Sequence, residues 1–361
     1  MDNTPVIHRP NRRLDDIDMF RGWCVLWMLA VHIAITMPPS VYGVIAMYDC
    51  VAEGFVFLAG VMIGYHYLPK FKADPIHTTR RLWMRALQIL ALHYGMALYV
   101  RLHLTFVRGE SYGAGVWQFL WDTLSWRYQD FLADILPMFV VFMALAPLGM
   151  WLIVRGLWPI LAAASIGMFA WGQWHPWDIS VRHQAAFPAI LWQLYFIAGG
   201  VWGIMRRNNV AITNPQRPWR ALGITWLVWL LMLMIPWIIF YASGHWMLTG
   251  LMWPNKWPLN IGRVLFLAPL MLFLYYFFMG LARREKPLPG AQTLVLVGQH
   301  SLFGFSLHAL LVYWWNEVAL ANIVPMALRP LLMVILMVLL ALAVRLRYGS
   351  RFVKPAPASA R

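Results

Sequence analysis

Residues 16–34 read DIDMFRGWCVLWMLAVHIA, and this stretch decides how the whole chain is interpreted. Asp16, Asp18 and Arg21 lie within its first six positions, and no Asp, Glu, Lys or Arg follows them within the stretch. A helix needs about 20 mostly apolar residues to cross the hydrocarbon layer of a bilayer. The stretch therefore predicts a membrane-spanning helix over 18–37 whose charged end lies at one membrane surface.

The composition extends this prediction to the rest of the chain. Of the 361 residues, 61% are hydrophobic and only 12% are charged, whereas soluble domains are close to half apolar and a quarter charged. These proportions exclude a globular cytosolic protein, a disordered chain and a partner such as nucleic acid. The net charge of +15 resides between apolar runs, so it indicates membrane topology. Two cysteines are too few for a disulfide framework or a zinc cluster.

We predict an all-α polytopic membrane protein, a bundle of about ten transmembrane helices. The predicted spans cover 18–37, 45–67, 82–107, 136–154, 157–173, 187–205, 221–243, 262–282, 292–315 and 328–346. The segment 116–133 is amphipathic and charged, which is typical of a helix lying in the membrane interface.

The basic residues predict the orientation of the bundle in the lipid bilayer. Most of the 29 Lys and Arg residues fall in connections on one side of the predicted spans. The positive-inside rule then predicts that both termini lie in the cytoplasm. We divide the chain into a cytoplasmic segment 1–17, one transmembrane domain 18–347 and a cytoplasmic tail 348–361.

Ionisable side chains inside spans are unfavourable, and each is a hypothesis of function. Arg21 and His32 are eleven residues apart, so they share one helix face about 16 Å from each other. Asp18 lies beside Arg21 at the cytoplasmic end. This arrangement can hold the phosphates of a long donor molecule while its reactive end reaches the imidazole. The alternative is an Arg21 that snorkels to the surface and a His32 that bonds a neighbouring helix.

The second predicted span contains one buried acid. It opens with YDCVAEGFVFLAG, and counting 1.5 Å per residue places Glu53 at the depth of His32. A carboxylate beside an imidazole orients the ring and stabilises the imidazolium that forms during proton transfer. A purely structural hydrogen bond is the alternative role for Glu53.

Three glycines recur at short spacings in the same span, at Gly54, Gly60 and Gly64. Small residues let membrane helices approach closely, so we predict that these glycines mark helix packing rather than contact with a bound molecule.

The late span 292–315 contains His300 and His308. The count along its helix places His308 at the height of His32, where it can contact substrate or bond another helix. Two histidines at one depth would also suit a metal, but no third or fourth ligand has the required spacing. We therefore predict no metal site.

Two further groups of charged residues lie at the ends of spans. Arg81 and Arg85, next to Arg80, begin the third span and either determine topology or bind donor phosphates beside Arg21. Asp130 and Asp134 lie at the far mouth of the fourth span, where they bind a polar acceptor or cap the helix.

These motifs together resemble the transmembrane acyltransferase family. The phrase IDMFRG with His32 resembles the opening of that family, and EGFVFLAG is similar to its second-span motif, with Ala59 where the pattern has Ser. The segments RRLWMR and GQHSLFGFSLH follow in the family's order, although Arg81 and Arg85 stand four apart rather than three. With ALHY and YQDFLADILP, the closer resemblance is to the OpgC-type succinyltransferases of osmoregulated periplasmic glucans.

The resemblance implies a ten-helix fold that passes an acyl group from cytoplasmic acyl-CoA, with succinyl-CoA as the expected donor, to a hydroxyl of a periplasmic glucan acceptor. It implies a catalytic role for His32 and donor binding by Arg21, Arg81 and Arg85, without a permanently bound cofactor.

The sequence leaves a second class of function open. A transporter or flippase of a glycan or lipid-linked sugar would also carry intramembrane charges, but it is expected to show inverted repeats, and none is evident. A homo-oligomer is compatible with the sequence.

Overall fold

The computed structural model describes residues 14–47, 49–106, 109, 115–127, 134–175, 187–243, 259–284, 286, 288–320 and 323–349. Within these ranges the regular structure is helical, which confirms the predicted all-α class. The helices are α1 Asp15–Ala34, α2 Pro39–Met47, α3 Val51–Met62, α4 Leu68–Ala73, α5 Pro75–Phe106, α6 Gly115–Leu124, α7 Ile135–Val154, α8 Trp158–Trp174, α9 Ala189–Arg207, α10 Pro218–Ser243, α12 Ile261–Ala282, α13 Ala291–Gln299, α14 Ser301–Leu320 and α15 Arg329–Tyr348.

Five of these helices are long and apolar enough to cross a membrane. They are α1, the continuous run Val51–Ala73, α7, α12 and the run Met326–Tyr348. The pair α13 and α14 adds a sixth span if it is counted as one, although its two parts meet at an angle of 94°. The chain is therefore a membrane protein, while the ten predicted spans and the cytoplasmic termini stay predictions.

Local sequence explains two departures from the predicted spans. Pro39 begins the separate helix α2, as proline favours the first turn of a helix, so the next long helix begins at Val51 rather than at residue 45. The span predicted over 292–315 is interrupted at His300, where α13 ends. Both departures shift the depth of side chains that a continuous helix would place elsewhere.

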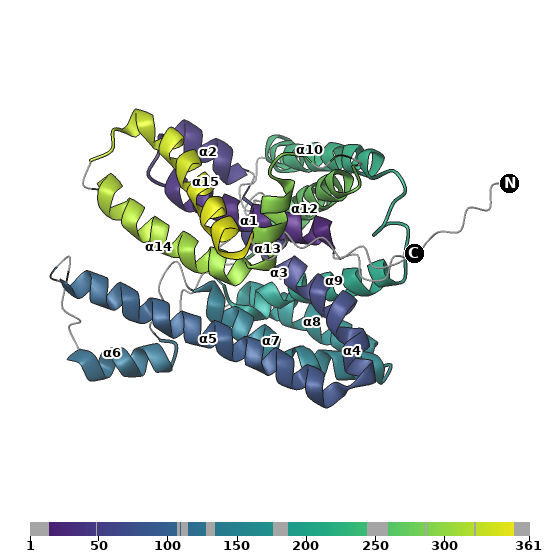
Figure 1. Cartoon of the computed structure of the whole chain (residues 1–361). Helices are drawn as coiled ribbons and strands as arrows, with labels where there is room; N and C mark the ends of the chain where they lie inside the picture. The colour runs from purple at the N-terminus through teal and green to yellow at the C-terminus, as the bar shows by residue number, and fades with distance from the viewer. Residues whose placement is uncertain are drawn as a thin grey trace, which may run out of the picture.

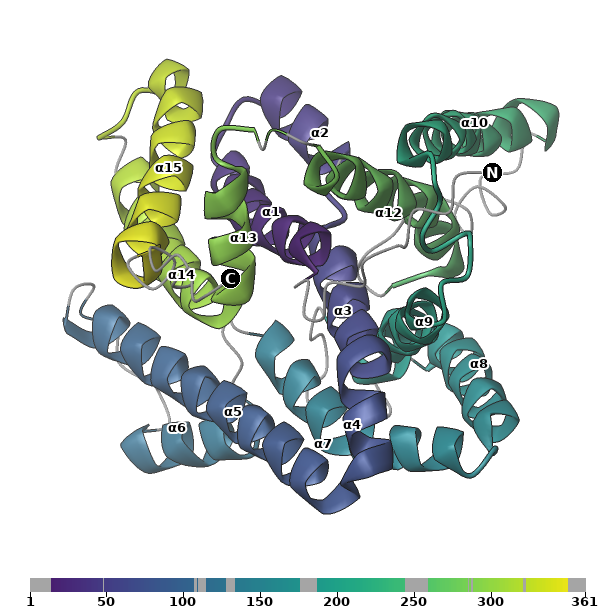
Figure 2. The same cartoon turned by 45° about the vertical axis from the view of Figure 1, so that its right-hand side comes forward.

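The centre of the molecule is formed by α1, α3 and α13 (Figures 1 and 2). On one side lie α14, α15 and α2, on another α10 and α12, and α5 to α9 complete the bundle in Figure 2. The helix α3 packs tightly against α9, and α1 packs against α13.

Glycines permit the closest of these contacts. A Cβ added at Gly60 would lie 1.9 Å from the carbonyl oxygen of Phe196, and one at Gly64 would lie 2.0 Å from that of Gly200. Any larger residue would push the two backbones apart. The prediction that Gly60 and Gly64 mark helix packing is thus confirmed.

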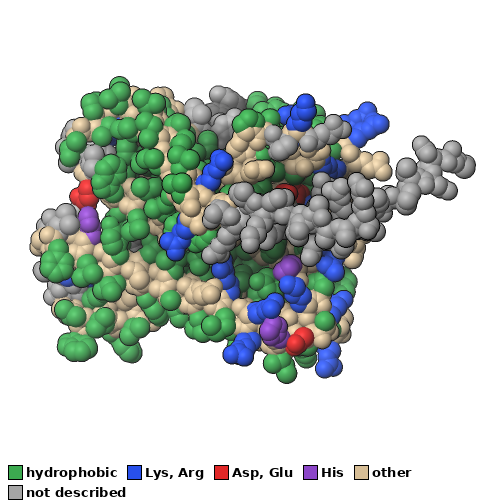
Figure 3. All heavy atoms as spheres, in the orientation of Figure 1, with side chains coloured by type: hydrophobic (Ala, Val, Ile, Leu, Met, Phe, Trp, Pro, Cys, Tyr) green, Lys and Arg blue, Asp and Glu red, His purple; other side chains and the backbone are tan. Residues whose placement is uncertain are grey.

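Apolar and basic side chains occupy different parts of the molecular surface. Apolar side chains cover most of the face in Figure 3, and Lys and Arg gather toward its right-hand side, where α4 lies. Long rows of exposed Leu, Val and Ile on α10 and α15 suit contact with lipid.

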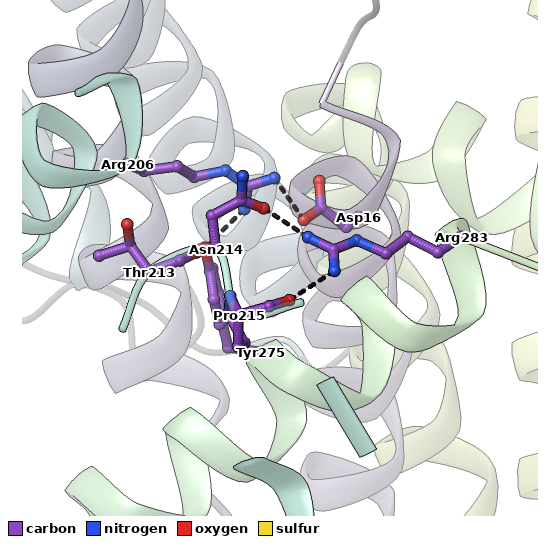
Figure 4. A network of polar contacts seen from close by, with 7 residues as sticks. All are labelled: Asp16, Arg206, Thr213, Asn214, Pro215, Tyr275 and Arg283. Carbon is purple, nitrogen blue, oxygen red and sulfur yellow. Dashed lines mark hydrogen bonds and ion pairs between the residues drawn. The ribbon is translucent and has the colours of Figure 1, made fainter. Parts of the chain in front are cut away.

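A polar network of seven residues ties three helices together near the start of α1 (Figure 4). The Asp16 carboxylate of α1 forms an ion pair with Arg206 of α9 at 2.6 Å, and Arg206 donates to the Tyr275 hydroxyl of α12 at 2.6 Å. At the end of α12, Arg283 donates to the carbonyl oxygen of Pro215 at 2.6 Å. The network holds the loop between α9 and α10 against the bundle.

Candidate active site

Two buried histidines meet at the centre of the bundle. The Nδ1 atom of His32 on α1 lies 2.8 Å from the Nε2 atom of His308 on α14. The His308 side chain is completely buried, and His32 is partly buried. The prediction that these residues lie at one height is confirmed by this contact.

The partners of the two rings determine their tautomers. The Nδ1 atom of His308 lies 3.2 Å from the carbonyl oxygen of Phe305, and a carbonyl can only accept a hydrogen bond. Neutral His308 therefore carries its proton on Nδ1 and accepts at Nε2. It follows that His32 donates from Nδ1 to His308, so the two rings form one hydrogen-bonded pair.

A small cavity of about 30 Å³ adjoins His32. Its polar lining residues are His32, Asp49 and Asp134, and its apolar lining residues include Ile135 and Phe305. This volume is enough for a water molecule or a hydroxyl group. The cavity can therefore hold a small polar group beside the imidazole.

Asp134 occupies the position before α7, but its side chain makes no capping hydrogen bond there. Its side chain instead lines the cavity beside His32, which suits the predicted binding of a polar acceptor. Asp130, predicted for the same role, lies outside the described residues.

A larger cavity of about 240 Å³ lies closer to the start of α1. Arg21, Arg85 and Tyr67 give it polar walls, and most of its remaining lining is apolar, including Phe55 and Phe139. The structure thus brings together two of the arginines that were predicted to bind one anionic donor.

The predicted donor-binding residues differ in their placement. Asp18 pairs with Arg21 at 3.5 Å and accepts a hydrogen bond from Gln299 at 3.2 Å, so it holds the guanidinium beside the larger cavity. Arg85 also lines a third cavity of about 320 Å³, which His300 and Tyr348 share. Arg81 is an exposed residue of α5.

Two residues connect the cavities. Ile135 of α7 and Phe305 of α14 line both the larger cavity and the small one at His32. The two cavities are therefore adjacent and share these two side chains as a common wall.

Glu53 is paired with a buried arginine. Its Oε1 atom accepts a hydrogen bond from Nε of Arg263 at 2.6 Å, while the contact of His32 goes to His308. Glu53 is thus paired with Arg263, and the neighbouring Gly54 lies against Cys24, eight residues before His32. The predicted role of Glu53 in orienting His32 stays a prediction, and His308 is the ring in contact with His32.

Sequence reasoning missed Asp49 and Arg263. Asp49 precedes α3 and carries no helical periodicity, and Arg263 lies near the start of a predicted span, where a charged residue is ordinary. Arg263 could have been identified from its position in the first turn of an apolar helix. A charged residue inside a membrane span usually has a partner and is a candidate for function. Among the described residues, no group of three or more His, Cys, Asp or Glu side chains could hold a metal ion.

Comparison with known families identifies the family of this chain. The family model described as OpgC protein matches residues 12–350, which is nearly the whole chain. The chain belongs to the OpgC family. No curated protein and no solved structure matches it. Membership in the OpgC family indicates a membrane transferase with a role in the modification of osmoregulated periplasmic glucans.

Proposed function

We propose that this OpgC-family protein is an O-acyltransferase that moves an acyl group, with succinyl as the expected group, from acyl-CoA to a hydroxyl of a periplasmic glucan. The observation that carries the proposal is the pair of cavities that share Ile135 and Phe305. One has two arginines at its polar end, and the other has the basic nitrogen of His32.

The larger cavity suits the donor. Arg21 and Arg85 would bind CoA phosphates through charge-assisted hydrogen bonds, and Asp18 fixes the Arg21 side chain. The pantetheine arm would lie against Phe55 and Phe139, toward Phe305. Since Lys and Arg gather at one end of the molecule (Figure 3), we place that end in the cytoplasm, with both termini, in the inner membrane.

The smaller cavity suits the reaction. The acceptor hydroxyl would occupy the space beside His32, whose Nε2 atom takes the hydroxyl proton while the oxygen attacks the thioester carbonyl. The carbon–sulfur bond then breaks, and the CoA thiolate leaves with that proton. The products are a glucan ester and free CoA. Asp134, which also lines this cavity, would stabilise the transient imidazolium through its negative charge.

The test uses the purified full-length protein in lipid vesicles, with labelled succinyl-CoA and acetyl-CoA as donors and isolated periplasmic glucan as acceptor. We expect labelled glucan with the wild-type protein. His32→Ala should lower the rate by about 10² to 10⁴, the usual contribution of a general base. His77→Ala, which changes an exposed residue at the start of α5, is the matched control.

A His32→Ala variant that transfers label at the wild-type rate would overturn the mechanism. Transport of unmodified glucan across the vesicle membrane, together with the absence of donor binding, would support the transporter alternative instead.

A further inference from the structure

A buried arginine connects the smaller cavity to an acid that lies outside it. Arg263 donates from Nε to Glu53 at 2.6 Å and from a terminal nitrogen to the backbone carbonyl of Asp49 at 2.7 Å. The same nitrogen lies 3.9 Å from the Asp49 carboxylate. Asn260 caps α12 by accepting from the backbone N–H of Arg263 at 2.8 Å. Four contacts thus hold Arg263 in place, and two of them join it to Asp49, which lines the smaller cavity.

Packing alone does not require this arrangement. Burial of ions is unfavourable unless each is paired, and Glu53, which is fully buried, already neutralises Arg263. A second acid at position 49 adds a negative charge that a small apolar residue would avoid. The backbone carbonyl of residue 49 would accept the same hydrogen bond whatever its side chain. Asp49 also lines the cavity beside His32, so it is placed to contact a molecule that binds there.

The chemistry of the sugar acceptor indicates which group Asp49 would bind in this cavity. The hydroxyl that reacts gives its only proton to His32, so a carboxylate in the same wall cannot bind that proton as well. In a hexose, the neighbouring hydroxyl lies within a hydrogen bond's length of the first, and an ionised carboxylate can only accept. Since Asp49 and His32 line the same small cavity, a hydroxyl beside His32 brings the neighbouring hydroxyl of the sugar to the wall that Asp49 forms.

We propose that Asp49 is an acceptor-binding residue that accepts a hydrogen bond from the sugar hydroxyl next to the one that reacts, and that Arg263 is the positioning residue that holds it. The ligand class is a vicinal diol of a hexose. This inference rests on the proposed function for its substrate, and it adds a binding residue that orients the acceptor before proton transfer.

The first measurement is glucan affinity without any donor, by calorimetry on full-length protein in detergent with isolated periplasmic glucan as the titrant. A hydrogen bond to a charged group corresponds to about a ten- to hundredfold change in affinity. We expect Asp49→Asn to weaken glucan binding by this factor and to leave CoA affinity unchanged. Asp16→Asn is the matched control, because it removes another buried, ion-paired aspartate, outside both cavities.

The second measurement varies the acceptor as well as the protein. Monodeoxy glucosides, each lacking one hydroxyl, are compared as acceptors of the wild-type protein and of Asp49→Asn. One deoxy position should raise the KM of the wild-type protein by the same ten- to hundredfold factor. The same deoxygenation should have no further effect on the variant, because both changes remove one hydrogen bond.

Wild-type glucan affinity in a folded Asp49→Asn variant would overturn the proposal. A fall in kcat at constant KM would also overturn it, since that result assigns Asp49 to proton transfer. If the wild-type protein shows no acyl transfer but Asp49→Asn still weakens glucan binding, the proposed reaction fails and the acceptor site stands.

Discussion

His308 offers the sharpest test of the site, because it is expected to act only through His32. We consider His308→Phe, which keeps a flat ring in the buried position but removes the nitrogen that accepts from His32 at 2.8 Å. His32 then loses the partner that selects its tautomer. It also loses the hydrogen bond that becomes charge-assisted when His32 takes a proton.

The magnitude follows from that change of charge. A hydrogen bond between neutral groups contributes about 0.5–1.5 kcal/mol, and one to a charged group about 1.5–3 kcal/mol. Only the difference of about 1–1.5 kcal/mol acts in the transition state, which corresponds to about a tenfold lower kcat. Loss of the preferred tautomer lowers the rate further, so we expect a total fall of ten- to a hundredfold with KM unchanged.

The assay is acyl transfer to glucan in vesicles, with His308→Gln as the matched variant, because its amide oxygen can still accept from His32. We expect His308→Gln to retain more activity than His308→Phe. The double variant His32→Ala, His308→Phe should be no slower than His32→Ala alone, since both changes disable the same base. Additive losses in the double variant, or wild-type activity in His308→Phe, would refute this reasoning.

Three further predictions concern the donor and the packing. Arg21→Ala and Arg85→Ala should each weaken CoA binding, measured by calorimetry, about ten- to a hundredfold. Unchanged CoA affinity in both variants would mean that these arginines only determine the orientation of the protein in the membrane. Gly60→Ala should lower the thermal unfolding midpoint, because its methyl group meets a backbone carbonyl, whereas Gly95→Ala, with open space around it, should not. Asp16→Asn should also lower that midpoint while the folded protein keeps its kcat; a lower kcat would tie the network of Figure 4 to the chemistry.

The parts of the site that sequence predicted are those set by one continuous helix. Arg21 and His32 belong to the continuous helix α1, so the residue count between them applies directly. The count that placed His308 crossed the break at His300, so its contact with His32 depends on the packing of α14 against α1. The pairing of Glu53 with Arg263 could not be predicted, because it joins residues 210 positions apart.

The remaining parts depend on contacts between distant segments. Asp49 and Arg263 are 214 positions apart and meet only after α3 and α12 have packed. A single sequence shows neither this pairing nor the boundary residues shared by the two cavities. The number of spans was also harder to predict than the helices themselves, since helix bending and burial within the bundle change which apolar runs reach across the bilayer.

The glycine contact between α3 and α9 has a consequence for how the protein moves. Two helices whose backbones touch at Gly60 and Gly64 cannot slide without separating, so α3 and α9 form one rigid unit. One wall of the larger cavity belongs to α3, and the opposite wall belongs to α5 and α7, which pack against each other. We therefore expect the second pair to shift outward when a bulky donor enters, as a shear motion against a stationary wall.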